Sequence, residues 1–179
     1  EKYPMANYNC AFTVINDFVA YHDLFYLLMV GSGVGVRVLK SDADQLPPVR
    51  TDLKILHKSY DPVPAGERLE YTNLTFQRDT ATLAIGDSKE GWAQALTRYF
   101  ELITNREYEG VTTLVVNYDS IRPKGERLKT FGGTASGSGS MMTMLDKIHK
   151  VVTAAGARDG AVRTQLRPID LLDIANIIG

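Results

Sequence analysis

A strand-like run at residues 112–117 leads through a polar loop and a glycine-rich turn into a helix-like segment at 141–154. The run is apolar and rich in β-branched residues, which is typical of a central strand buried on both faces. Other strand-like and helix-like stretches alternate along the chain. This order predicts α/β architecture, in which helices pack in layers against a sheet.

Local patterns predict the remaining elements. Strands are expected near residues 8–15, 36–39, 53–56, 69–76 and 162–166. Helices are expected from Asn16 or Asp17 to about 30, from Asp87 to about 103, and from Pro168 onward. Asp87 and Glu90 have the spacing of a capping box. Prolines punctuate short alternating strands between 41 and 110, so three parts are expected: 1–40, an insertion at 41–110, and 111–179.

Composition excludes several classes of protein. A formal net charge of −1 over 179 residues gives no overall basic field for duplex nucleic acid. No apolar run approaches the roughly 20 residues that span a bilayer. The single cysteine excludes an internal disulfide framework and fits a reducing compartment, the cytoplasm by default. Neither end has the polar tail typical of a natural terminus, so we expect a segment of a larger protein.

The loop after residues 112–117 has the composition of an anion site. Four cations precede the turn Gly132-Gly-Thr-Ala-Ser-Gly137, namely Arg122, Lys124, Arg127 and Lys129. Free N–H groups at a helix start, with cations beside them, bind phosphate. The alternative is a solvated surface loop, the usual location of a charge run.

Two stretches of this loop carry a family resemblance. Ile121-Arg-Pro-Lys-Gly125 and Leu128-Lys-Thr-Phe-Gly-Gly-Thr-Ala-Ser-Gly137 resemble the "IRPxGxxIxxFGGTASGP" loop of adenosylcobalamin-dependent (class II) ribonucleotide reductases. Ser138 departs from the family, which usually has proline there. The last ten residues resemble the family's "DAADICNLIG", and Lys89-Glu-Gly-Trp92 is similar to an element of the monomeric type. The resemblance implies part of a ten-stranded α/β barrel with an inserted α+β subdomain.

The resemblance also implies the chemistry of the whole enzyme. In such a reductase, adenosylcobalamin generates a thiyl radical on a central cysteine, and this radical abstracts the 3′ hydrogen of a ribonucleotide. The 2′ hydroxyl leaves as water, and a cysteine pair supplies two electrons before a thioredoxin-type protein reduces it again. The pair Asn9-Cys10 matches the family's "NC" element, so Cys10 would be one reducing thiol. With one cysteine, this chain cannot hold both the radical and the pair, so alone it is expected to be inactive.

Further roles follow from the matched motifs. Gly31-Ser-Gly-Val-Gly-Val-Arg-Val38 is similar to the "GGGVGFSV" strand beside the substrate, which places Asn9, Gly33 and Gly35 near the substrate. The family's loop 1 contacts an allosteric deoxynucleoside triphosphate. The residues expected to bind this effector are Asp17, Arg122, Lys124, Lys129, Gly132, Gly133, Thr134 and Ser136. In monomeric members an insertion such as 41–110 mimics the missing dimer partner.

Other interpretations remain open. The glycines at 31–35 follow a helix rather than a strand, so a helix C-cap is favoured over a dinucleotide-binding turn. Cys10 could be an inert small hydrophobe, Asp17 a helix cap, and the insertion decorative. The histidines lack metal-ligand spacing, so no metal is expected. A stand-alone nucleotide-binding regulatory module is the main alternative function; a phosphotransferase is less favoured because no Walker lysine follows the glycines.

Overall fold

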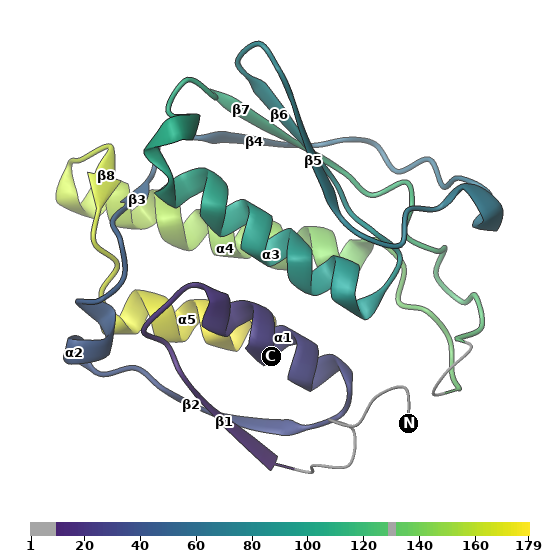
Figure 1. The fold of residues 1–179 in the computed structure, drawn as a ribbon, viewed down its shortest axis with the longest axis horizontal. Helices are drawn as coiled ribbons and strands as arrows, with labels where there is room; N and C mark the ends of the chain where they lie inside the picture. The colour runs from purple at the N-terminus through teal and green to yellow at the C-terminus, as the bar shows by residue number, and fades with distance from the viewer. Residues whose placement is uncertain (1–9, 129–131) are drawn as a thin grey trace.

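The computed structural model of the chain describes residues 10–128 and 132–179. Figure 1 shows four layers. They are a four-stranded sheet, the long helices α3 (Lys89–Thr104) and α4 (Gly139–Asp159), the shorter helices α1 (Val19–Met29) and α5 (Pro168–Ile178), and a two-stranded sheet. The helices therefore form the centre of the molecule, with a sheet on either side. None of the helices in the described ranges is long and apolar enough to cross a membrane.

The two-stranded sheet belongs to a strand–helix–strand motif at the start of the described chain. β1 (Cys10–Val14) and β2 (Gly33–Arg37) pair in parallel, and α1 (Val19–Met29) connects them. The register places Cys10 opposite Gly33. Gly31, with φ of 91°, ends the helix in a left-handed conformation that glycine adopts without strain. The helix C-cap interpretation of this glycine is therefore confirmed.

The second sheet has the order β4-β7-β6-β5. Its strands are β4 (Lys54–His57), β5 (Asn73–Gln77), β6 (Thr80–Ala84) and β7 (Thr113–Asn117). β4, β7 and β6 run parallel, and β5 is antiparallel to β6. The run predicted to be a central strand is β7, whose Leu114 and Val116 are buried. The helix α3 (Lys89–Thr104) connects β6 to β7 as a parallel crossover.

The remaining elements complete the helical layers and their connections. α4 and α5 pack against each other, and β3 pairs with β8 in a short antiparallel ladder. The bounds of the remaining elements are α2 (Lys40–Ala43), β3 (Val49–Arg50), η2 (Ala65–Glu67), η3 (Arg106–Tyr108), α4 (Gly139–Asp159), β8 (Arg163–Thr164) and α5 (Pro168–Ile178). Pro168 occupies the first turn of α5, as expected.

Three local expectations differ from the structure. β2 begins at Gly33 rather than at residue 36, because pairing with β1 holds the two glycines in the ladder. The N-cap of α3 is Ser88, whose Oγ accepts a hydrogen bond from Gly91 N at 2.8 Å, so the predicted cap at Asp87 is wrong. α4 continues to Asp159 and ends at Gly160 in the left-handed region, beyond the expected residue 154.

One hydrophobic core joins the strand–helix–strand motif to the segment 41–110. Phe100 of α3 stacks on Phe18 and Tyr21 at ring-centroid distances of 4.7 and 5.2 Å. Tyr21 and Phe100 are both almost completely buried. Aromatic pairs of this kind add to the stabilisation from area burial alone. The α1–α3 contact therefore fixes the segment 41–110 against the strand–helix–strand motif.

His149 of α4 is a buried polar residue with both ring nitrogens bonded. Nε2 donates to the carbonyl oxygen of Leu53 at 2.8 Å, which leaves Nδ1 to accept from the Tyr99 hydroxyl at 2.8 Å. This pattern requires the neutral imidazole. Burial lowers the pKa of His149 below its ordinary value, because the charged form loses its hydration.

We expect this histidine to make the chain less stable in mild acid. The unfolded chain binds a proton near pH 6.5 while the folded chain resists it, so the free energy of unfolding falls as pH decreases below about 6.5. The free energy of unfolding changes by at most about 1.4 kcal/mol per pH unit through this one group. Urea unfolding at pH 7.5 and 5.5 measures this change, and His149→Asn should remove most of the difference. Equal changes in both proteins would contradict the assignment.

Candidate functional site

The cationic loop begins at the carboxyl edge of the parallel strands β4, β7 and β6. This edge is where ligands bind in open α/β sheets. Asn117 Oδ1, at the end of β7, accepts a hydrogen bond from Asp119 N at 2.9 Å. The Asp119 carboxylate accepts from Lys58 Nζ and from Asp61 N, both just beyond β4. The loop therefore leaves the sheet in a fixed direction (Figure 1).

Beyond this point the loop folds back on itself as a hairpin. Arg127 and Thr134 form an antiparallel bridge. Gly125 N donates to Ala135 O at 2.9 Å, and Ala135 N donates to Glu126 O at 2.8 Å. The cationic arm and the glycine-rich arm therefore lie side by side. The predicted juxtaposition of cations and glycines is present, although it arises from hairpin pairing.

Two arginines and two carboxylates tie this hairpin to the segment 41–110. Arg122 Nε lies 3.0 Å from both carboxylate oxygens of Asp87, and Arg122 N donates to the same carboxylate at 3.1 Å. Arg68 donates to the two oxygens of Glu126 at 2.7 and 2.8 Å. Arg68 also lies 3.6 Å from Asp87, so the two pairs form one network.

Two other cations of the loop, Lys124 and Arg127, face solvent. Neither has an ion-pair partner among residues 10–128 and 132–179. Lys129 lies outside the described residues. An anion approaching the hairpin would therefore meet these side chains before Arg122, whose charge is already matched by Asp87.

The glycine-rich arm is also accessible. Its exposed residues are Gly132, Gly133, Thr134 and Ser136. Gly132 and Gly133 have φ of 70° and 82°, which only glycine adopts readily. Ser136 Oγ lies 3.1 Å from Ser140 Oγ in the first turn of α4. That first turn contains no acidic side chain, and its N-cap Ser138 makes no side-chain hydrogen bond to the helix.

Asp17 lies at the start of α1. Its Oδ1 accepts a hydrogen bond from Val19 N at 2.9 Å, so this carboxylate satisfies a free donor of the first helical turn. The N-cap residue of α1 is Phe18, so the expected cap at Asp17 is off by one residue, although its carboxylate still bonds to the start of the helix. A role in binding the effector stays a prediction.

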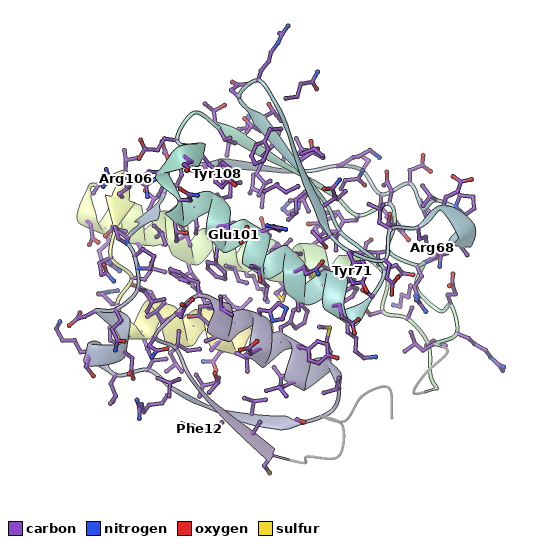
Figure 2. The ribbon with its side chains drawn as sticks, viewed as in Figure 1. Phe12, Arg68, Tyr71, Glu101, Arg106 and Tyr108 are labelled. Atoms are coloured by element: carbon purple, nitrogen blue, oxygen red, sulfur yellow. The ribbon has the colours of Figure 1, made fainter. Side chains whose placement is uncertain are left out.

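Cys10 lies on a face of the β1–β2 pair that is exposed among residues 10–128 and 132–179. Its thiol is free and exposed, and Gly33 and Gly35 of β2 are exposed on the same face. Phe12 is 66% exposed on this face and covers Gly35, where an added Cβ would lie 3.1 Å from the phenyl ring (Figure 2). Helix α1 packs on the opposite face. The structure thus brings Cys10, Gly33 and Gly35 together, whereas Asn9 lies outside the described residues.

Sequence reasoning missed three residues of the loop network. Arg68 lies in none of the motifs, Glu126 occupies a variable position of the loop motif, and Asp87 was interpreted as a helix cap. The pairs are 58 and 35 residues apart in sequence, so no local pattern connects them. The one available signal was that Glu126 is the single acidic residue between 120 and 137.

Two cavities lie away from these residues. One, of about 180 Å³, is lined mainly by apolar side chains of α1, β2 and α5; the other, of about 390 Å³, is lined by Arg50, Asp52, Glu109, Val162 and Arg163. Adenosylcobalamin is larger than the ligands for which clefts reach about 1,000 Å³, so it fits neither. Within the described part of the chain, no group of three His, Cys, Asp or Glu side chains could hold a metal ion.

Comparisons with known proteins agree on one family. The family model described as "B12-dependent ribonucleotide reductase, insertion domain" matches residues 54–152. An adenosylcobalamin-dependent ribonucleoside-triphosphate reductase of Lacticaseibacillus paracasei is 35% identical over 171 residues, which are 89% of this chain and 22% of that protein. The enzyme of the same name from Lactobacillus acidophilus is 33% identical over 167 residues, covering 87% of this chain and 22% of that protein.

A solved structure gives the same answer for the fold. The crystal structure of a B12-dependent (class II) ribonucleotide reductase matches 96% of this chain and 27% of that chain, with a TM-score of 0.73 and 25% identity. The expected fold class, an α/β part of this barrel with an insertion, is confirmed. The chain spans about a fifth of the length of the curated relatives it matches.

Proposed function

Because this chain belongs to the B12-dependent (class II) ribonucleotide reductase family, we propose that it is one segment of a ribonucleoside-triphosphate reductase. In this proposal the segment contributes a reducing thiol and the loop that binds an allosteric nucleotide. The observation that carries the proposal is the exposed hairpin of Lys124 and Arg127, paired with a glycine-rich arm at the carboxyl edge of parallel strands.

Cys10 supplies reducing equivalents in the proposed reaction. The substrate radical loses its 2′ hydroxyl as water, and two electrons come from two thiols that become a disulfide. Cys10 is one of these thiols; the other thiol and the radical-bearing cysteine lie outside this chain, which has a single cysteine. The face of β1 and β2 that is exposed among the described residues supports this role, because parallel strands are normally covered on both faces. The rest of the barrel and the ribonucleotide would cover Cys10, with Asn9, Gly33 and Gly35 next to the sugar.

The hairpin binds the triphosphate of a deoxynucleotide effector. Lys124 and Lys129 would pair with phosphate oxygens, and Arg122 would add its Nη1, since its other donors are engaged by Asp87. Peptide N–H groups near Gly132, Gly133, Thr134 and Ser136 would complete the anion site. Asp17 would bind the effector's ribose through Oδ2, since Oδ1 accepts from Val19 N.

The three-part division at 1–40, 41–110 and 111–179 gives the middle part a role of its own. We assign it the place of a dimer partner, since α3 packs on α1 through the stacked rings of Phe18, Tyr21 and Phe100. Other parts of the reductase hold adenosylcobalamin, which supplies the radical. A thioredoxin-type protein is the proposed reductant, and the cytoplasm is the proposed location, where a free cysteine stays reduced.

Calorimetric titration of the purified chain with dATP, dGTP, dCTP and TTP tests the effector site. At least one should bind, and Lys129→Ala should weaken that binding by about tenfold, the scale of one lost charge-assisted contact. Lys147→Ala, which removes a lysine of α4, is the control and should change the dissociation constant less than twofold. Binding that Lys129→Ala leaves unaltered would show that the loop is wrongly assigned.

A stand-alone regulatory module that binds nucleotides without catalysis is the second candidate. The single cysteine favours it, because the hairpin needs no thiol partner to bind a nucleotide. Sequencing the native gene beyond the codon for Gly179 separates the two. A following barrel half with further cysteines supports the reductase.

A further inference from the structure

Arg68 and Asp87 hold the cationic hairpin without belonging to it. Arg68 follows η2, and Asp87 lies between β6 and α3, so both belong to the segment 41–110. Figure 2 shows Arg68 on the side of the molecule where the loop after β7 runs. Each residue contacts the hairpin at a different point. Asp87 binds Arg122 at the beginning of the hairpin, and Arg68 binds Glu126 further along it.

The burial and geometry of this network differ from those of an ordinary surface ion pair. The side chains of Arg68 and Asp87 are 10% and 11% exposed, whereas Arg98 and Glu101 on α3 are 48% and 43% exposed. Arg68 donates to both oxygens of Glu126, and Asp87 accepts from the side chain and the backbone of Arg122. Bidentate, partly desolvated pairs fix orientation, while exposed pairs contribute little.

The network also arranges the charge of the hairpin. Glu126 is the single acid between residues 120 and 137, and it stands between Lys124 and Arg127 in sequence. Its carboxylate would repel an approaching phosphate if nothing balanced it. The guanidinium of Arg68 lies against that carboxylate and offsets its repulsion, which favours the attraction of Lys124 and Arg127 for an anion.

We propose that Arg68 and Asp87 are positioning residues of the nucleotide site, which fix the path of the hairpin and neutralise Glu126 without touching the nucleotide. This inference rests on the proposed function. It adds that the segment 41–110 controls nucleotide affinity through two ion pairs. A contact between this segment and the bound nucleotide is not required.

The variant Asp87→Asn distinguishes a positioning role of Asp87 from a simple effect of its negative charge on anion binding. The substitution removes a negative charge near the anion site, so a simple field effect would strengthen nucleotide binding. Positioning predicts the opposite, because Arg122 loses its anchor and the hairpin loosens. We expect the dissociation constants of the purified chain for the bound deoxynucleotide and for inorganic tripolyphosphate to rise about tenfold, a typical size for coupling through a positioning residue.

The variant Arg68→Met tests the Arg68–Glu126 ion pair, and a second substitution should partly restore binding. We expect weakening of about tenfold or more, because the hairpin loosens and the Glu126 carboxylate loses the guanidinium of Arg68. The double variant Arg68→Met with Glu126→Gln should recover part of the loss, since the repelling charge is gone. Matched controls are Asp44→Asn and Arg98→Met, which break exposed ion pairs elsewhere and should change affinity less than twofold.

Hydrogen exchange gives a readout that needs no nucleotide. In Asp87→Asn we expect the amides of residues 120–128 to exchange about tenfold faster, while those of α3 keep their protection. Unaltered exchange in the hairpin overturns the inference, as does nucleotide binding by Asp87→Asn that equals or exceeds the wild type. If the wild type binds none of the nucleotides but its hairpin exchange responds as expected, the proposed effector site fails and the structural role of the two residues stands.

Discussion

Replacing Cys10 by serine is expected to abolish deoxyribonucleotide formation by the reductase of which we propose this chain is a part. A serine hydroxyl cannot form the disulfide that releases two electrons, so the loss should exceed about 10³-fold, as for other groups that act in the chemical step. The measurement is product formation from a ribonucleoside triphosphate by the full-length enzyme, with adenosylcobalamin and dithiothreitol supplied. Substrate binding should be nearly unaffected, because serine keeps the shape of the cysteine side chain and only replaces its sulfur by a smaller oxygen.

The control for this experiment lies one residue away. Ala11→Ser introduces the same hydroxyl on the opposite face of β1, because side chains alternate along a strand. It should retain most of the activity. Turnover by Cys10→Ser within tenfold of the wild type would remove Cys10 from the reducing pair, while leaving the effector site untouched.

Replacing Gly86 by alanine should cost about 3 kcal/mol of unfolding free energy or more, the upper range for overpacking. An added Cβ would lie 2.4 Å from Glu70 O and 2.6 Å from the carbonyl carbon of Tyr71. Both are backbone atoms, so no side-chain rotation can relieve the clash. The same junction holds the hydrogen bond from Gly86 N to Thr72 Oγ1 at 3.1 Å. Urea unfolding at neutral pH measures the loss.

Gly66→Ala is the matched control. Gly66 lies in the short η2 turn, and an added Cβ there would have no heavy atom within 4 Å. Its effect should stay within about 0.5 kcal/mol of zero, as for other unconstrained surface positions. Equal stability of the two variants would mean that the chain near Glu70 moves aside. Because Asp87 N donates to Leu69 O at 2.7 Å, such movement would also disturb the anchor of Arg122.

Local sequence patterns were sufficient for the order of most elements. The β-branched run at β7 and the apolar spacing of α1 and α3 depend on neighbours within a few residues, which a sequence displays directly. Boundaries were less accurate where packing decides them. α4 continues through Gly156, a poor helix former, and this glycine lies so close to Thr51 that a Cβ would be 2.2 Å from its Oγ1. The tight contact between remote segments carries the helix past the point where local propensity predicted its end.

The order of residues was enough to identify the loop, through its cations, its glycines and its resemblance to one reductase family. Which of those cations an anion can reach depends on how the chain folds. Arg122 is bound by Asp87, 35 residues away, and Glu126 is bound by Arg68, 58 residues away. The fold also decided that Cys10 lies opposite Gly33 on an exposed face of the described chain, through a register between two separate strands. Charge pairing and strand register join residues that are distant in sequence, and no local pattern of residue types encodes such partners.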